Sequence, residues 1–330
     1  MALSIGLIIV LILVLVSEFI NGWTDAPNAI ATVVATRVLK PRTAAILAPV
    51  GNIIGAFIGT EVAKTIGTGI VKPEAITLIT LAAAMMGIIL WGFTAWYLGM
   101  PISKSHALVA GLTGAGLATA GPSALLWSGW GKVLIGLGFS SILGLVGGFL
   151  LAWSIRKSCC SMQRPKATKI FSILQILSAG GMALSHGSND GQKFIGIFTL
   201  ALVLGGVLKS FQVHTWVILI CSLTMGFGTS IGGWRIIKTM GEKMVRLEPY
   251  QGFAAESAAT GAIFLASHLG IPLSTTHTIN TSIMGVGAAT RASGIRWNVV
   301  KDIVYAWVLT FPICAIIGYL MATIFKLIFS

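Results

Sequence analysis

Apolar residues come in long runs along this chain, and short polar segments separate the runs. The runs lie at 2–20, 43–62, 75–98, 133–155, 215–234 and 303–328. A helix needs about 20 mostly apolar residues to cross the hydrocarbon core of a bilayer. The pattern therefore predicts an all-α polytopic membrane protein with about 10 to 12 transmembrane segments.

Two segments, 2–36 and 170–206, fit no simple span. Each has about 35 residues, which is too long for one straight crossing and too short for two. Both have polar residues at their centre, flanked by Gly. We expect two broken helices, because non-helical backbone inside a membrane is tolerated where it lines a cavity.

Composition agrees with a membrane protein and argues against nucleic-acid binding. The 330 residues are 55% hydrophobic and 9% charged, with a mean hydropathy of +0.92 and a net charge of +13. In a soluble protein such a charge would suggest nucleic acid. Here the basic residues lie in short loops, which is the positive-inside pattern of membrane proteins. The predicted surroundings are membrane lipid, with no nucleic acid as a partner.

The chain contains an internal repeat. Gly22-Trp-Thr-Asp25-Ala-Pro-Asn28 returns 165 positions later as Gly187-Ser-Asn-Asp190-Gly-Gln-Lys193. A second motif, Pro101-Ile-Ser103-Lys-Ser105-His106, returns 171 positions later as Pro272-Leu-Ser274-Thr-Thr276-His277. Because the copies follow the same order, we expect two structural repeats, at 1–155 and 170–330.

The basic loops indicate how the two repeats are oriented. Basic residues are concentrated in loops 37–42, 156–169, 235–248 and 291–301, whereas their counterparts carry few. That asymmetry is typical of inverted-topology repeats, with the basic loops inside. We therefore expect 156–169 to be a basic cytoplasmic linker in a multi-pass protein of the cell (inner) membrane. Counting crossings puts both termini outside.

The first motif places an acid within apolar surroundings in each half. A charge at bilayer depth costs about 2.5–3.5 kcal/mol on insertion scales, so it usually faces a cavity or a partner. Neutral oxygen donors accompany Asp25 and Asp190, and such ligands suit Na⁺ more than H⁺, although H⁺ stays open. The predicted Na⁺ ligands are Asn21, Thr24, Asp25, Asn28, Ser105, Ser185, Asn189, Asp190 and Thr276. The alternative is a hydrogen-bond network that only holds helices together. No transition metal is expected.

The second motif favours anion binding. Pro101 and Pro272 each end a helix, and hydroxyl-rich residues then open a new one. A helix start offers free N–H groups and the positive end of its dipole, which bind phosphate or sulfate readily. Ordinary helix capping is the alternative. We expect the two helix starts to meet at the membrane midplane, where His106 and His277 orient neighbouring hydroxyls or relay protons.

Together these motifs resemble the inorganic phosphate transporters of the PiT type. The resemblance implies symport of phosphate with Na⁺ or H⁺, a homodimer, and Glu61 and Glu256 as coupling acids. The phosphate-binding residues it suggests are Asp25, Asn28, Ser103, Lys104, Ser105, Asp190, Gln192, Lys193, Ser274, Thr275 and Thr276. One departure is Thr24, which stands where the first copy of the family motif usually has Asn.

Other functions compete with this interpretation. A permease for sulfate or another oxyanion would use similar helix starts, but carboxylates can accept a hydrogen bond from hydrogen phosphate and not from sulfate. An enzyme is not expected, because the side chains of Ser105 and His106 diverge on a helix and no third catalytic group accompanies them. A passive channel would not require two acids in matching positions.

Overall fold

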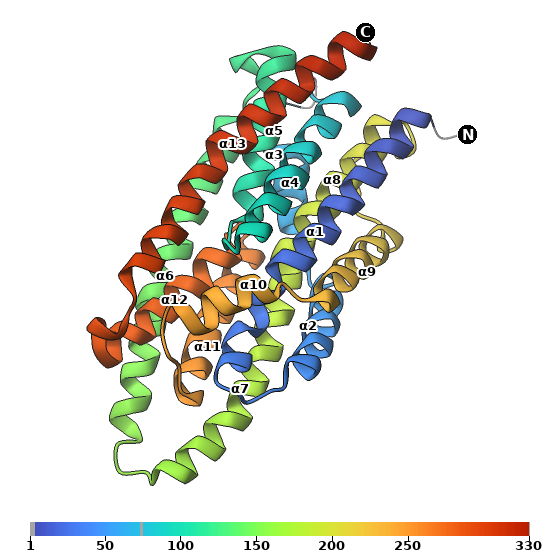
Figure 1. Cartoon of the computed structure of the whole chain (residues 1–330). Helices are drawn as coiled ribbons and strands as arrows, with labels where there is room; N and C mark the ends of the chain where they lie inside the picture. The colour runs from blue at the N-terminus through green and yellow to red at the C-terminus, as the bar shows by residue number, and fades with distance from the viewer. Residues whose placement is uncertain (1–3, 73–74, 330) are drawn as a thin grey trace.

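The computed structural model describes residues 4–72 and 75–329, and over these ranges its regular structure is helical apart from one isolated bridge between Val71 and Leu125 (Figure 1). Predicted ranges that reach residues 1–3, 73–74 or 330 lie partly outside the described residues. The first half holds α1 (Ile5–Ala35), α2 (Pro41–Gly55), α3 (Glu61–Gly69), α4 (Leu78–Leu98), α5 (Lys104–Ala120) and α6 (Trp127–Ser158). The second half holds α7 (Arg164–His186), α8 (Gln192–Leu204), α9 (Thr215–Ile231), α10 (Trp234–Ile237), α11 (Pro249–His268), α12 (Thr275–Arg291) and α13 (Trp297–Phe329).

Several helices are long and apolar enough to cross a membrane, so the prediction of an all-α multi-pass protein is confirmed. Over the described residues there are five: α1, α4, α6, the joined α7–α8, and α13. A sixth is formed if α9 is joined to residues 234–243 across a 63° bend. The predicted 10 to 12 segments are not reached by this criterion, because the remaining helices are short or carry many polar residues.

The two segments expected to be broken are continuous. Residues 5–35 form one helix that runs through Pro27, so the predicted break there is wrong. Pro27 lacks an N–H for the helix and crowds the carbonyl four residues earlier, but the buried residues around it hold the helix together. In the second segment, the π-helical turn Gly187–Gly191 joins α7 to α8 without a break. A π turn widens a helix locally and changes the direction of the side chains that follow.

At each proline motif one helix ends and a new one begins, as predicted, and the paired helices α4–α5 and α11–α12 pack together as helical hairpins. Gly99 and Gly270 follow the ends of α4 and α11 with φ of 71° and 65°, which only Gly adopts without strain. The new helices α5 and α12 then start after Ser103 and Ser274.

The two halves of the chain interleave. α6 of the first half packs against α12 of the second half. Correspondingly, α13 of the second half packs against α5 of the first half. Likewise α1 packs on α9, and α7 packs on α2. Helices α6 and α7 extend into the predicted linker, so only residues 159–163 of 156–169 are outside a helix. Both termini lie at one end of the molecule, and this connection lies at the other (Figure 1).

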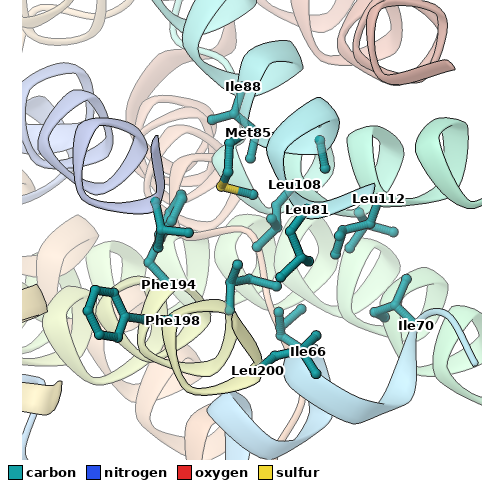
Figure 2. Close-up of a cluster of buried hydrophobic side chains, with 14 of the residues drawn as sticks. Ile66, Ile70, Leu81, Met85, Ile88, Leu108, Leu112, Phe194, Phe198 and Leu200 are labelled. Carbon is teal, nitrogen blue, oxygen red and sulfur yellow. The ribbon is translucent and has the colours of Figure 1, made fainter. Parts of the chain in front are cut away.

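A large apolar core joins the halves. Figure 2 shows Ile66 of α3, Leu81 and Met85 of α4, and Leu108 of α5 grouped with Phe194 of α8. All five side chains are buried. This core fixes the α4–α5 hairpin against the helix that follows the second acidic motif, and so it sets the distance between the motifs.

Candidate functional site

The tips of the two hairpins meet inside the protein. The hydroxyl of Ser105 at the start of α5 donates to the carbonyl oxygen of Leu273, at 3.0 Å. The hydroxyl of Thr276 at the start of α12 donates to the carbonyl oxygen of Ile102, at 3.3 Å. Each helix start is thus bonded to the loop of the other hairpin, as expected for two helix starts that meet.

Asp25 of α1 lies beside this junction and is 3% exposed. Its carboxylate accepts hydrogen bonds from Thr24 at 3.1 Å, Asn28 at 3.3 Å and Thr276 at 3.2 Å. The ammonium of Lys104 lies 3.5 Å from it. The amide of Asn28 also donates to the Thr276 hydroxyl at 3.0 Å, so α1 and α12 are tied together at this carboxylate.

Asp190, in the π turn, forms the second half of the cluster. It pairs with the ammonium of Lys193 one turn later and accepts a hydrogen bond from Thr275 at 2.8 Å. The Nε2 atom of His186 lies 3.3 Å from the same carboxylate. Lys193 also donates to the hydroxyl of Ser105, at 2.5 Å. Through this lysine, α8 is linked to the start of α5.

The two halves converge on one place. Ligand atoms of Asp25, His186 and Asp190 lie within 4.8 Å of one another, a grouping that can hold a metal ion. The sequence analysis did not foresee this trio. Two carboxylates and their neighbouring hydroxyls suit a hard cation, for which an imidazole is a less suitable ligand. Lys104 is buried, and among the described residues its Nζ has no hydrogen-bond partner, which leaves its N–H groups available to an anion.

Eight of the predicted phosphate ligands meet in this cluster: Asp25, Asn28, Lys104, Ser105, Asp190, Lys193, Thr275 and Thr276. Ser103 and Ser274 act here as helix caps, since their hydroxyls accept from the backbone N–H groups of His106 and His277 at 3.3 and 3.2 Å. The capping alternative therefore describes these two serines.

Four other predicted ligands have partners elsewhere. Asn21 donates to Glu18 at 3.0 Å, Ser185 to the carbonyl of Met182 at 3.0 Å, Asn189 to Ser267 at 3.0 Å, and Gln192 to the carbonyl of Ile58 at 2.8 Å. Asn189 lies within the π turn, which directs its side chain toward Ser267 of α11.

The two histidines after the caps do not orient hydroxyls. Their rings meet edge to face with centroids 4.6 Å apart. His277 stacks on Trp307 and His106 stacks on Phe311, both from α13. Both nitrogens of His277 and the Nδ1 of His106 lack a hydrogen-bond partner within the described ranges. Aromatic packing against α13 explains why the expected hydrogen bonds are absent.

The predicted coupling acids occupy different surroundings, and neither contacts the Asp25–Asp190 cluster. Glu61 is exposed at the start of α3, where the backbone N–H of Thr60 donates to it at 2.9 Å and lowers its pKa. Glu256 of α11 is fully buried, as expected. It accepts hydrogen bonds from Thr32, from Ser178 and, at 3.3 Å, from Gln175.

Two buried polar residues near the cluster were missed. Glu18 is wholly buried on α1, seven positions before Asp25 and therefore on the same helix face. The Oδ1 atom of Asn52, on α2, lies 3.1 Å from the Nδ1 atom of His186. The helical spacing of Glu18, Asn21, Asp25 and Asn28 could have identified Glu18. Asn52 lies alone in an apolar run, so no such pattern indicated it.

Known proteins resemble this chain over nearly its full length. The model of the phosphate transporter family matches residues 21–318. A "Probable low-affinity inorganic phosphate transporter" of Rhizobium meliloti (strain 1021) is 44% identical, covering 96% of this chain and 95% of its own. One of the same name from Bacillus subtilis (strain 168) is 41% identical, covering 98% of each.

A solved structure has the same fold. It is titled "The sodium-dependent phosphate transporter" and matches 98% of this chain and 100% of its own, with a TM-score of 0.88 and 23% identity. Both relatives described above bear the names of transporters. With its helical membrane architecture and the match over residues 21–318, this chain belongs to the phosphate transporter family.

Proposed function

We propose that this protein imports inorganic phosphate by symport with Na⁺ through alternating access. The observation that carries the proposal is the burial of two carboxylates, Asp25 and Asp190, with two lysines and hydroxyls from both hairpin starts. Buried ionisable groups in a membrane protein usually serve a solute or ion pathway. The names of the relatives and of the structural neighbour support phosphate and sodium as the cargo.

The charges suggest how coupling works. Lys193 already pairs with Asp190, whereas Lys104 lies 3.5 Å from Asp25 with no hydrogen bond. A phosphate bound near Asp25 would be repelled by the carboxylate unless a cation lay between them. A Na⁺ ion bound by Asp25 and nearby oxygens reverses that repulsion, and Lys104 then donates to the phosphate. By linkage, each ligand strengthens binding of the other.

We assign the two ligands to overlapping sets of residues. The Na⁺ ion is bound by Asp25 with the hydroxyls of Thr24 and Thr276, which bond to that carboxylate, and with Asn28, whose amide nitrogen donates to it. The phosphate is bound by the N–H groups at the starts of α5 and α12 and by Lys104. A hard cation prefers such a cage of oxygens, whereas a proton needs only one acceptor, which is why Na⁺ is favoured over H⁺.

We infer that 1–155 and 170–330 are inverted repeats. The chain runs through α1 and through α7–α8 in opposite directions, and the same holds for α6 and α13 (Figure 1). The main packing contacts also occur in corresponding pairs: α6 on α12 with α13 on α5, α1 on α9 with α7 on α2, and α1 on α4 with α7 on α11. With the basic connection 156–169 in the cytoplasm, both termini are outside the cell membrane. The homodimer implied by the family resemblance belongs to the same proposal.

The test is uptake into proteoliposomes. We expect phosphate to accumulate when an inward Na⁺ gradient is imposed at constant pH and membrane potential, and sulfate to accumulate much less. Equal phosphate uptake with choline in place of Na⁺ and only an inward proton gradient would replace sodium with a proton. Sulfate uptake equal to that of phosphate would instead favour a general oxyanion permease. Asp25→Asn should abolish accumulation under every gradient.

A further inference from the structure

A second basic pocket lies away from the Asp25–Asp190 cluster. It has a volume of about 240 Å³ and lies where the end of α12 meets the loops before α11 and before α13. Its lining includes Arg246, Arg291, Arg296, Gln251 and Thr290. None of these residues belongs to the proposed transport site, and the motifs of the sequence analysis do not include them.

The pocket carries three positive charges without acidic side chains in its lining. Within the described ranges, none of the three guanidinium groups has a carboxylate partner. Arg291 donates to the hydroxyl of Ser293 at 2.8 Å and Arg296 to a backbone carbonyl at 3.4 Å, while Arg246 makes no hydrogen bond. All three keep free N–H groups. Like charges in one pocket repel one another, so an anion bound among them is stabilised.

The neighbouring groups leave this charge in place. Glu248, on the loop that carries Arg246, pairs instead with Arg164 at 2.7 Å. The amide of Gln251 donates to the hydroxyl of Thr290 at 2.9 Å, which fixes two polar side chains on the wall. Gln251 is itself buried, at 5% exposed. The pocket therefore combines three exposed cations with a hydrogen-bonded polar wall.

We propose that this pocket binds a phosphate group. The planar guanidinium fork matches two phosphate oxygens, and three forks from different segments can surround one tetrahedral group. Two sources share this chemistry, the headgroup of an anionic phospholipid and free inorganic phosphate. Trp297 follows Arg296 and is 54% exposed, as is typical of aromatic residues at headgroup depth. A lipid headgroup can therefore reach the pocket from the membrane.

Chemical modification of arginine tests the proposal residue by residue. The full-length protein in nanodiscs of phosphatidylcholine is treated with phenylglyoxal, and modified arginines are mapped by mass spectrometry. One arm adds inorganic phosphate, and another replaces half of the lipid with phosphatidylglycerol in phosphate-free buffer. At ten times its Kd, a ligand should slow modification of Arg246, Arg291 and Arg296 about tenfold. Arg37 and Arg42, in another exposed basic loop, are the internal controls.

The two arms distinguish a lipid headgroup from free phosphate as the bound group. They also show which results would contradict the proposal. Protection by phosphatidylglycerol alone assigns a lipid headgroup, and protection by phosphate alone assigns the free anion. Arg246→Lys keeps the charge but loses the fork, and since Arg246 makes no hydrogen bond this variant should fold normally. It should reduce protection of Arg291 and Arg296. Equal protection of Arg37 and Arg42 would mean a diffuse surface potential, and no protection in either arm would also overturn the proposal.

Discussion

The ammonium of Lys193 is a buried charge held by several contacts. It is fully buried, pairs with Asp190 and donates to the hydroxyl of Ser105. Breaking a buried ion pair from one side leaves an uncompensated charge, whereas removing both charges together is often close to neutral. The contribution of the Asp190–Lys193 pair to stability can therefore be measured separately from its contribution to transport.

Replacing Lys193 tests this separation. We expect Lys193→Met to lower the free energy of unfolding by about 3–5 kcal/mol, because Asp190 is left without its main partner. The double variant Asp190→Asn/Lys193→Met should recover most of that loss and still fail to accumulate phosphate. Denaturation in detergent and proteoliposome uptake are the measurements, with the exposed Lys209→Met as control. A double variant as unstable as the single one would show that the pair is not the cause.

Thr276 offers a test of the hairpin contact. Its hydroxyl donates to Asp25 and accepts from Asn28, so Thr276→Val removes a hydrogen bond to a charged group. We expect Na⁺ and phosphate binding to weaken by about 1.5–3 kcal/mol. Thr199→Val is the matched control, since Thr199 is equally buried but bonds only to its own helix at 2.8 Å. Similar half-saturating concentrations in both variants would remove Thr276 from the site.

Glu61 gives a prediction about pH. Its pKa is lowered by the N–H of Thr60, so the folded protein holds the proton less tightly than the unfolded chain. The stabilisation is present above the unfolded pKa and is lost as the pH falls through the folded pKa. Glu61→Gln should therefore lower the Tm slightly at neutral pH and not at all in strong acid, with Glu242→Gln as control. A deficit that persists in acid would exclude this cause.

Sequence alone identified most charged members of the cluster but not their contacts. Asp25, Lys104, Asp190 and Lys193 stand out because charges are costly in apolar segments. The bond between Asp25 and Thr276 joins residues 251 positions apart, and no local spacing encodes such a contact. Asn189 was predicted as a ligand because it precedes Asp190 in the sequence, but in the π turn its amide donates to Ser267 of α11.

At the scale of the helices, the π turn Gly187–Gly191 packs very close to α2. A Cβ atom on Gly187 would lie 2.1 Å from the carbonyl oxygen of Asn52, whereas one on Gly180 would have no neighbour within 4 Å. We expect Gly187→Ala to destabilise the protein by about 1–3 kcal/mol through overpacking. Gly180→Ala, on the helix that leads into the π turn, should be neutral or stabilising by up to about 1 kcal/mol. Equal thermal stability of the two variants would contradict the close approach.

Hydropathy predicted the long helices better than the short ones. The run 133–155 lies within α6, and 303–328 lies within α13. The run 43–62 instead divides into α2 and α3, because Gly59 turns the chain with φ of 83°. A hydropathy profile does not detect the turn at Gly59, because the residues on both sides of it are either buried in the protein or face lipid.

For the molecule as a whole, the positions of the connections predict its orientation. Native Cys160 is exposed beside the basic connection, and Ser123 is exposed in the loop after α5. In a chain without its other cysteines, an impermeant maleimide should label Cys160 only from the cytoplasm. With Cys160 replaced, Ser123→Cys should react only from outside. Labelling of both positions from the same side would contradict the inverted arrangement.

The interleaving of the halves has a consequence for biosynthesis. The α4–α5 hairpin packs against α13, which the ribosome synthesises after the other helices described here. Until α13 has been inserted, the hairpin that carries Lys104 lacks its final cover, and its polar face has to be shielded by lipid headgroups, water or the insertion machinery. A chain that terminates before residue 297 should therefore be recognised as unassembled and degraded, rather than accumulate as a partly active protein. Quality control of this protein then depends on the 33 residues of α13, which lie far in sequence from both acidic motifs.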